Sequence, residues 1–455
     1  MYETWKQDGI LNAMKSFKKQ YGKMYTLWFG PLPTIHITDY ELAKDQMVKH
    51  GSEYTLRFVP EIQEVPRKGL GIILNDGPVW QEHRRFALQT LRNFGVGKNV
   101  MEEKIMSEYN YQIGLALQKS ENGKCILDPM RFFDILIGNI INQLLFGERF
   151  TEDNADFWYL KKLLDEALEF TFIDTAIPYW LMTTPLLKWR TDKLQAPEFK
   201  FLEFMKEKSM KRYEEVKRGE RVLSEDATDF ADAYFYKMEQ DKKNGIESSF
   251  DFDNLATDLE DLWSAGQETS ALTLTWGVLL LLNRPEYIDK IYEELLSVTE
   301  GDRQLSLTDK PNTPIFNATV NEVHRIASIL NFNVFRKTEK DKVIDGYRIP
   351  AGTPITAEIS VIMADDEIFP EFDKFDPARF LNDEKKVAHV VPFGMGKRAC
   401  LGEALARSEL YLILGNLLLE HDLKPNGRVP EQKTMSESTF FNKPQRFECY
   451  FVSRK

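Results

Sequence analysis

A short segment near the C-terminal end surrounds one cysteine with the groups that a metal-binding thiolate needs. Residues 393–402, FGMGKRACLG, have the form F-x-x-G-x-R-x-C-x-G around Cys400. A cysteine binds a metal as the thiolate, and free backbone N–H groups at the start of a following helix favour that charge. Gly396 and Gly402 leave room for a flat ligand close to the backbone, and Phe393 could keep water from the sulfur. An arbitrary cysteine is more often a buried structural residue, but this dense pattern favours the metal-binding interpretation.

A second segment places a hydroxyl beside a carboxylate within a long helical pattern. Residues 263–270, WSAGQETS, lie in a helix predicted over about residues 254–284. A glycine within a helix costs about 1 kcal/mol relative to alanine, so Gly266 needs an explanation, and a small residue would let a ligand approach the backbone. Thr269 and Glu268 could hold water and pass protons into an otherwise apolar pocket. The alternative is an ordinary core helix with one acidic residue turned to solvent.

Two further pairs have spacings that place their side chains on one face of a helix. Trp80 and Arg84 would present an indole N–H and a guanidinium one turn apart, and both are donors suited to a carboxylate. The alternative is a surface aromatic–arginine stack. Glu322 and Arg325 form an i,i+3 ion pair, which alone is as uninformative as the many such pairs on protein surfaces.

Together these motifs resemble those of the microsomal cytochrome P450 family along nearly the whole chain. The cysteine segment matches the family's haem-binding signature, and residues 265–269 match its oxygen-activation helix, A-G-x-[DE]-T, at every position. The resemblance implies the cofactor haem b, with Cys400 as the iron ligand. It places Ala265, Gly266 and Phe393 around the cofactor. The residues that it places at the haem propionates are Trp80, Arg84, Arg398, Arg336 and Lys68, which stands where relatives often carry arginine.

The same resemblance gives the ion pair of Glu322 and Arg325 a meaning that its spacing lacks. In the family an E-x-x-R pair is buried behind the haem and joined by an arginine from a P-x-R-F segment. Pro377-Ala378-Arg379-Phe380 supplies that arginine here. The resemblance therefore implies a buried triad of Glu322, Arg325 and Arg379 that holds the cysteine loop in place and does no chemistry.

The activity implied by the resemblance is monooxygenation of a lipophilic fatty acid, steroid or xenobiotic. Electrons would come from NADPH through NADPH–cytochrome P450 reductase, with cytochrome b5 as a further candidate donor, and Thr269 and Glu268 would be catalytic. Arg85 and Lys98 could add to a local basic patch for an acidic reductase. One alternative is a haem-thiolate isomerase or dehydratase that rearranges a lipid peroxide without a reductase, but such enzymes commonly lack the acid–alcohol pair. Another is a haem sensor or carrier without catalysis, which the complete oxygen-activation helix disfavours.

The chain departs from the family pattern in two places that affect substrate and location. Relatives begin with a membrane-spanning helix and a proline-rich hinge, and neither is present in this sequence. Residues 328–336 also lack the prolines that usually shape one wall of the substrate pocket, so no substrate can be carried over. Position alone suggests five pocket-lining candidates, which are Trp263, Ala265, Ile329, Val334 and the loop Arg57–Arg67.

The predicted elements that must position these residues are mostly helices. Strands are predicted at Met24–Phe29 and Thr34–Ile37, followed by mostly helical sequence from Glu41 to about Asn331. Val343–Tyr347 contains an Asp-Gly turn typical of a hairpin. A long apolar helix is predicted from about Gly402 to Glu420. We therefore predict a mainly α fold with small β-sheets, the cytochrome P450 fold, as a single domain over residues 1–455.

The composition limits the classes of partner and the location that fit this sequence. The net charge of −12 argues against nucleic acid as a partner, and three cysteines form neither a disulfide framework nor a C-x-x-C metal pair. No apolar run is long enough to span a bilayer. Residues 172–189 are rich in apolar and aromatic side chains but contain two prolines, so we predict a loop that dips into the membrane surface; the alternative is a packed interior loop. By resemblance, the location is the cytosolic face of the endoplasmic reticulum membrane.

Overall fold

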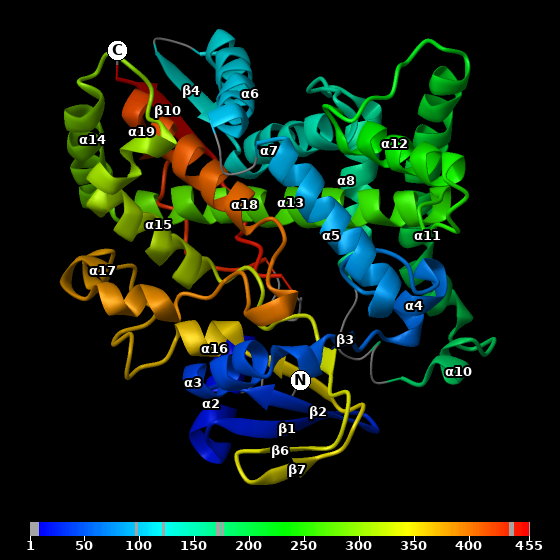
Figure 1. Ribbon diagram of the computed structural model, residues 1–455. Helices are drawn as coiled ribbons and strands as arrows, with labels where there is room; N and C mark the ends of the chain where they lie inside the picture. Colours follow the sequence, from blue (N-terminus) through cyan, green and yellow to red (C-terminus); the bar gives the residue numbers. More distant parts are fainter. Residues whose placement is uncertain are drawn as a thin grey trace.

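The protein is mainly helical, with one long helix through its centre. The computed structural model describes residues 9–95, 99–120, 123–169, 174, 177–435 and 441–454. Helix α13 (Phe252–Leu282) crosses the middle of the molecule (Figure 1) and has most of its side chains buried. It packs chiefly against α7 (Pro129–Phe146) and α11 (Lys188–Lys217). Almost every residue of α7 is buried, which explains its continuous apolar sequence.

The other helices surround this centre. Helix α5 crosses α13 on one side of the molecule, and α14, α15 and α17 lie at the end opposite to α11 and α12 (Figure 1). Their bounds are α2 (Ile10–Tyr21), α3 (Tyr40–Lys44), α4 (Glu61–Arg67), α5 (Gly77–Asn93), α6 (Asn99–Gln118), α8 (Ala155–Ala167), α10 (Tyr179–Met182), α12 (Phe230–Lys243), α14 (Pro285–Thr299), α15 (Pro314–Ala327), α16 (Ile359–Met363), α17 (Ala378–Asn382), α18 (Glu403–Glu409) and α19 (Gly415–Glu420). Short turns of 3₁₀ or π helix are η1 (Asp45–Lys49), η2 (Gly51–Tyr54), η3 (Leu307–Asn312), η4 (Glu384–His389), η5 (Gly396–Arg398) and η6 (Leu410–Leu414).

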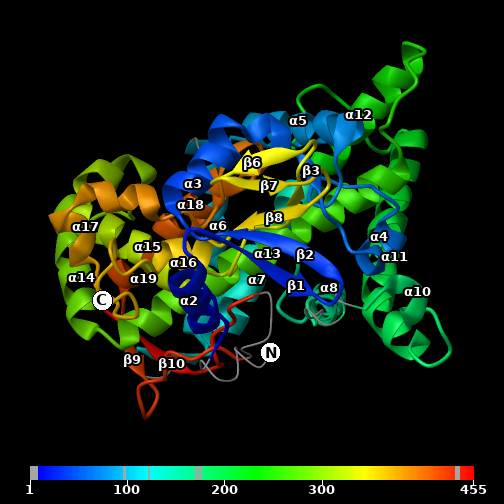
Figure 2. The same cartoon turned by 90° about the horizontal axis from the view of Figure 1, so that it is seen from below.

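Three small sheets complete the fold, and the largest gathers strands from both ends of the chain (Figure 2). Its order is β1 (Met24–Phe29), β2 (Leu32–Ile37), β8 (Pro354–Ala357), β5 (Arg336–Lys337) and β3 (Leu56–Arg57). Only the β2–β8 pair is parallel. The second sheet has the order β4 (Lys124–Leu127), β10 (Cys449–Ser453) and β9 (His421–Pro425), and the third is the hairpin of β6 (Lys342–Ile344) and β7 (Tyr347–Ile349).

The predicted elements agree closely with the observed ones. The long helix over about residues 254–284 is α13, which Asp251 caps by accepting a hydrogen bond from the Asn254 N–H at 2.8 Å. The hairpin turn forms at Asp345 and Gly346, both at positive φ (48° and 82°), as a tight Asp-Gly turn requires. The remaining strands were not predicted, because each has at most five residues, too few for a clear period; they are β3, β4, β5, β8, β9 and β10.

The helix predicted from about Gly402 to Glu420 exists but is not regular. It begins as α18, widens into the π segment η6 and continues as α19. A π segment inside a helix shifts the side chains beyond it, and such segments are frequent at functional sites. Among the described residues, no helix combines the length and the apolar character needed to cross a bilayer.

Candidate active site

Cys400 lies in the loop between η5 and α18. The Cys400 N–H donates to the carbonyl of Phe393 at 2.9 Å, which closes the loop. Gly396 is needed there for a reason that the sequence did not indicate. A Cβ on Gly396 would lie 1.7 Å from the carbonyl oxygen of Met47, so the glycine admits the backbone of η1. Gly402 has only the Cys400 sulfur near its missing side chain, at 4.0 Å.

The surroundings of the Cys400 sulfur have two opposing effects on the pKa of the thiol. Backbone N–H groups of Gly402 and Glu403 donate to it, as the predicted helix start requires, and Arg84 also favours the thiolate. Although the Cys400 side chain is exposed, the protein atoms around it remove part of its hydration, and this desolvation raises the pKa of the thiol. The N–H groups act in the direction that the sequence predicts, but they do not outweigh the desolvation. Binding of a metal ion, which deprotonates a coordinating thiol, would have to complete the effect.

Phe393 is held between two side chains beside the cysteine loop. Its ring meets that of His324 edge-on, with centroids 5.2 Å apart, and the guanidinium of Arg407 lies 4.7 Å from its centroid. Burial lowers the pKa of His324 to about 3, so this imidazole is neutral. The position of Phe393 is thus fixed from two sides, which suits the predicted role of covering the sulfur.

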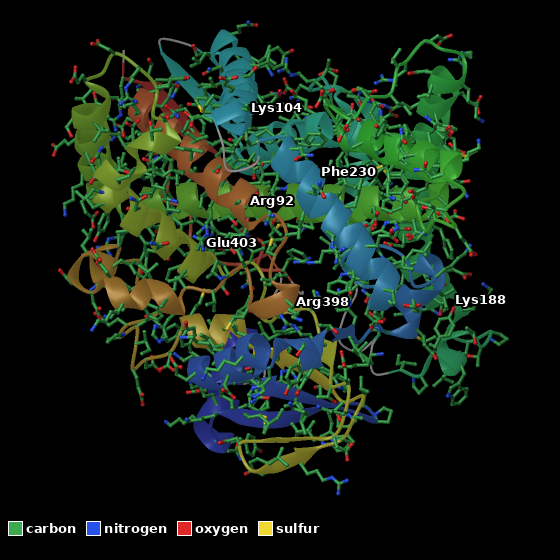
Figure 3. All side chains as sticks on the ribbon, viewed as in Figure 1. Arg92, Lys104, Lys188, Phe230, Arg398 and Glu403 are labelled. Carbon is green, nitrogen blue, oxygen red and sulfur yellow. The ribbon has the colours of Figure 1, made fainter. Side chains whose placement is uncertain are left out.

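Four arginines from distant segments converge near the cysteine loop, and we call Arg57, Arg84, Arg336 and Arg398 the arginine group. Arg57 and Arg336 are direct partners across strands β3 and β5. Arg84 comes from α5 and donates to the Ala399 carbonyl at 2.6 Å. Arg398, labelled in Figure 3, lies in the segment between the sheet and α18 and donates to the carbonyls of Thr55 and Asn75.

The arginine group has more positive charge than its surroundings balance. Burial and the charge of Arg84 together lower the pKa of Arg336 to about 10, and burial with the charges of Arg84 and Arg336 lowers that of Arg398 to about 9. Burial and the same repulsion lower the pKa of Arg57. Among the described residues, Nη1 of Arg336 and Nη1 of Arg398 are buried without a hydrogen-bond partner. Unpaired guanidinium N–H groups in a cationic site fit a ligand with carboxylates.

The remaining residues predicted at the propionates lie in different surroundings. The indole N–H of Trp80 donates to the Ile72 carbonyl at 3.0 Å, and its ring stacks 3.3 Å from the guanidinium of Arg398. Trp80 therefore positions Arg398 rather than offering its own N–H. Lys68 is exposed at the end of α4 and does not join the arginine group. Arg57 lies in the arginine group although it was not predicted there, because strand β3 is too short for a sequence pattern to indicate its pairing with Arg336.

Helix α13 presents Ala265 and Thr269 to a cavity of about 340 Å³. The Thr269 hydroxyl donates to the Ala265 carbonyl at 2.7 Å, so its oxygen can still accept a hydrogen bond. Gly266 does not face this cavity. A Cβ there would lie 2.6 Å from Cδ1 of Ile141 on α7, so this glycine allows the two helices to pack closely, and its prediction as a residue of the cofactor site is not supported.

Glu268 is buried and held by two lysines. Its carboxylate accepts from Lys161 of α8 at 2.8 Å and pairs with Lys443 of the C-terminal segment at 2.5 Å. Both lysines also pair with Asp165, whose side chain is 44% exposed. Through these ion pairs Glu268 is linked to the partly exposed Asp165, and it is not the solvent-facing acidic residue of the alternative interpretation. Burial raises the pKa of the nearby Asp134 to about 7.

The predicted triad behind the cysteine loop is confirmed. Arg325 donates to both carboxylate oxygens of Glu322, at 2.7 and 2.9 Å, and Arg379 donates to the same group at 3.0 Å. All three side chains are buried. Arg379 also donates to backbone carbonyls of residues 370 and 374, so the triad fastens the segment that leads toward Cys400.

Most of the cavity wall is apolar, and the pocket candidates from the sequence divide into two sets. Ala265, Val334 and much of the loop Arg57–Arg67 line the cavity, whereas Trp263 and Ile329 do not. Trp263 is fully buried behind the wall, with ring centroids 6.3 Å from Phe157 and 5.4 Å from Phe201. The apolar residues that line the cavity include Phe29, Phe58, Ile62, Leu164, Leu168, Leu194, Phe332, Phe335 and Phe441.

Comparisons with known proteins agree with this site. The family model "Cytochrome P450" matches residues 1–451. "Probable cytochrome P450 cyp-35D1" of Caenorhabditis elegans is 37% identical over 435 residues, which cover 94% of this chain and 87% of that protein. "Cytochrome P450 2C28" of Mesocricetus auratus is 34% identical over 450 residues, with coverage of 98% and 90%. "Cytochrome P450 2H1" of Gallus gallus is 31% identical over 462 residues, with coverage of 98% and 89%.

Proposed function

The chain belongs to the cytochrome P450 family, and on that premise we propose that it inserts one atom of dioxygen into a lipophilic substrate. Its class is that of the P450 monooxygenases, which are oxidoreductases, and its cofactor is haem b. The finer part of the proposal concerns the electron donor, the substrate and the residues. The electrons would come from NADPH through a flavoprotein reductase.

The residues present fit haem b on the proximal side and at the propionates. Cys400 would hold the iron, and the unpaired N–H groups of Arg336 and Arg398 would bind the propionates together with Arg57 and Arg84. When bound, a thiolate-ligated haem supplies the activation of dioxygen. Phe393, fixed by His324 and Arg407, would exclude water from the sulfur.

The observation that carries the catalytic proposal is the place of Thr269 in the cavity wall. Its hydroxyl is one helical turn from Ala265, in a cavity whose other walls are mostly apolar. There the hydroxyl oxygen can accept from a water and hold a proton where the substrate reacts. Glu268 would connect that proton to solvent, with Lys161 and Lys443 fixing the position of its carboxylate.

A basic hollow next to the arginine group supports docking of an acidic electron donor. It is lined by Arg84, Arg85, Arg92 and Lys397, and no carboxylate is among its lining residues; Figure 3 labels Arg92 on α5. Positive charge on a surface speeds the approach of an acidic partner such as a reductase or cytochrome b5. Lys98, predicted to join this patch, lies outside the described residues.

Association with the endoplasmic reticulum membrane is supported by exposed aromatic side chains near α10. Trp180 and Trp189 are 70% and 65% exposed, and Leu186 is 78% exposed. Part of the predicted membrane loop, residues 172, 173, 175 and 176, lies outside the described residues. Trp180→Glu should reduce flotation with neutral liposomes, and unchanged flotation would remove this part of the proposal.

The first test concerns ligation. The ferrous protein with carbon monoxide should show the red-shifted absorption of a thiolate-bound haem, and Cys400→Ser should abolish that band. Cys125→Ser and Cys449→Ser are matched controls, because both thiols are buried away from the site. Loss of the band in either control but not in Cys400→Ser would contradict the assignment.

The decisive test concerns Thr269. Thr269→Ala should still bind haem and consume NADPH, but it should release more hydrogen peroxide and form several-fold less product, because proton delivery is misdirected. Thr275→Ala is the matched control, since its hydroxyl also donates to a carbonyl four residues earlier in α13 but lies outside the cavity wall. Full product from a hydroperoxide without reductase, undiminished in Thr269→Ala, would favour the isomerase instead.

A further inference from the structure

One corner of the cavity contains three carboxylates around a single arginine. We call Arg67, Glu198, Glu260 and Asp261 the acidic corner. Nη1 of Arg67, at the end of α4, donates to Glu198 of α11 and to Glu260 of α13, each at 2.6 Å. Nη2 donates to Asp261. All four residues line the cavity that Ala265 and Thr269 also line, so the corner and the proposed reaction site share one space.

The charges in this corner do not balance. One guanidinium faces three carboxylates, and no side chain of the four is more than 17% exposed. Among the described residues, no other lysine, arginine or histidine pairs with these carboxylates. Buried carboxylates without a matching cation are costly, because they lose their hydration. The corner is therefore short of positive charge.

The uncompensated negative charge belongs to the two glutamates rather than to Asp261. Both oxygens of Asp261 are occupied, since one accepts from Arg67 and the other accepts from the N–H groups of Ile72 and Ile73 at 2.6 and 2.9 Å. The through-space attraction of Arg57 also acts on Asp261. Asp261 thus has a structural role in fixing the loop after α4.

Among the described residues, the glutamates accept fewer hydrogen bonds than Asp261, since Asp261 accepts three, Glu260 two and Glu198 one. Glu260 accepts from Arg67 and from the hydroxyl of Ser264 at 3.0 Å. Burial, together with the charges of Glu198 and Asp261, raises the pKa of Glu260 to about 8 against the effect of Arg67. Within the described part of the chain, only one oxygen of Glu198 has a hydrogen-bond partner, and Nε of the buried Arg67 has none.

No other charged group of the cavity compensates for the corner. Glu268 also lines the cavity, but Lys161 and Lys443 neutralise it locally. The walls between the corner and Thr269 are built mainly from apolar and aromatic side chains. The cavity therefore suits a ligand with an apolar body and one positively charged group.

We propose that Glu198 and Glu260 bind the ammonium group of a lipophilic base, and that this contact places the apolar part of the molecule toward Ala265 and Thr269. The proposal rests on the proposed function, because it takes this cavity as the substrate site. The ammonium would supply the cation that the corner lacks, and Arg67 would keep both carboxylates in place. Neutral molecules of the same shape would bind through the apolar walls alone.

The test compares two probes that differ in one atom. Trimethyl(4-phenylbutyl)ammonium carries a fixed positive charge, and (5,5-dimethylhexyl)benzene has carbon in place of the nitrogen. The quaternary nitrogen has no lone pair, so it can neither bind iron nor change its charge with pH. Equilibrium dialysis against the haem-loaded enzyme measures both affinities. Glu198→Gln should weaken binding of the cation about tenfold and leave binding of the neutral probe within about twofold.

A control variant separates a local effect from the overall charge. Glu203→Gln removes the same charge from an exposed position of α11 outside the cavity, and it should leave both affinities unchanged. Glu198→Lys should go further and make 5-phenylpentanoate bind better than the cation. Equal response of both probes to Glu198→Gln, or tighter binding of the carboxylate by the unaltered enzyme, would overturn the proposal.

The outcome does not depend on turnover. The carbon monoxide spectrum of each variant verifies that the haem site is intact, and NADPH-dependent oxidation of the neutral probe tests the monooxygenase proposal separately. If the unaltered enzyme oxidises the neutral probe but does not prefer the cation, only the acidic corner is rejected. Cation selectivity without any NADPH-dependent oxidation would reject only the proposed function.

Discussion

The arginine group and the acidic corner are both buried, and both carry charge that the protein does not balance, but with opposite sign. Arg57, Arg336 and Arg398 repel one another, which together with burial lowers their pKa values. Glu198 and Glu260 repel one another, and the pKa of Glu260 is raised. For the first region we propose the two propionates of haem b, the cofactor of this family, as the missing partner.

The two regions differ in the partners of their charged groups, and this difference decides what each imbalance of charge implies. Among the described residues, the guanidinium groups of the arginine group donate hydrogen bonds to backbone carbonyls and to no carboxylate, so the folded structure of this region in the absence of an anion also depends on other contacts. The acidic corner contains its own cation, Arg67, around which the carboxylates are organised. The first region should therefore respond to mutation mainly in cofactor binding, and the second mainly in stability and ligand charge.

The largest expected effect is a loss of stability when the acidic corner is mutated. Arg67→Met should lower the free energy of unfolding by about 3–5 kcal/mol, because it leaves three buried carboxylates without their cation. Urea-induced unfolding measures this change. Lys68→Met is the matched control, since the adjacent lysine is exposed, and it should change stability by less than about 0.5 kcal/mol. A comparable loss in both variants would show that the corner is not held by Arg67.

Lys68→Met also tests the assignment of the propionate residues. If Lys68 binds a propionate, as the sequence analysis predicts, its loss should accelerate haem release. We expect no such effect, because Arg57 and not Lys68 lies in the arginine group. Rapid release of haem from Lys68→Met would restore the prediction made from the sequence.

The second effect belongs to the arginine group. Arg336→Met removes a buried cation with one hydrogen bond, to the Met395 carbonyl, and with one unpaired nitrogen. The haem-free protein should lose little stability, because the repulsion within the group is relieved at the same time. Transfer of haem to an acceptor protein should become about tenfold faster, because a charge-assisted bond to a propionate is lost. A large loss of stability without faster haem transfer would contradict the cofactor role.

The elements and the cysteine loop were accessible from the sequence because their signals are local. Helix α13, the hairpin at Asp345 and the pattern around Cys400 each lie within one continuous segment. The triad was accessible only through the family, since the spacing of Glu322 and Arg325 is common on surfaces. Local signals thus indicated the fold class and the candidate metal ligand.

The rest depended on contacts between distant segments. The pairing of Arg57 with Arg336 joins two strands of two residues each, which have no detectable period. The clamp on Glu268 brings Lys161 and Lys443 together across most of the chain. The reason for Gly266 is the close approach of α7, which is a matter of packing and not of ligand binding. No motif encodes such contacts.

The smallest expected effect is a change of melting temperature with pH, and it tests the charge of the acidic corner directly. The folded pKa of Glu260, about 8, lies above its ordinary value of 4.5, so the folded protein holds this proton more tightly than the unfolded chain does. The resulting stability is fully present below about pH 4.5 and is lost as the pH rises through 8. Glu260→Gln cannot ionise, so its melting temperature relative to the unaltered protein should increase by a few degrees between pH 5 and pH 8.

Glu203→Gln, altered at an exposed position, should show a constant difference over that range. Since Arg336 is a base with a lowered pKa, it titrates near pH 10 and adds nothing in this window. A difference for Glu260→Gln that stays constant with pH would mean that Glu260 ionises as an ordinary carboxyl, and the corner would then have no excess of charge for a bound cation to relieve.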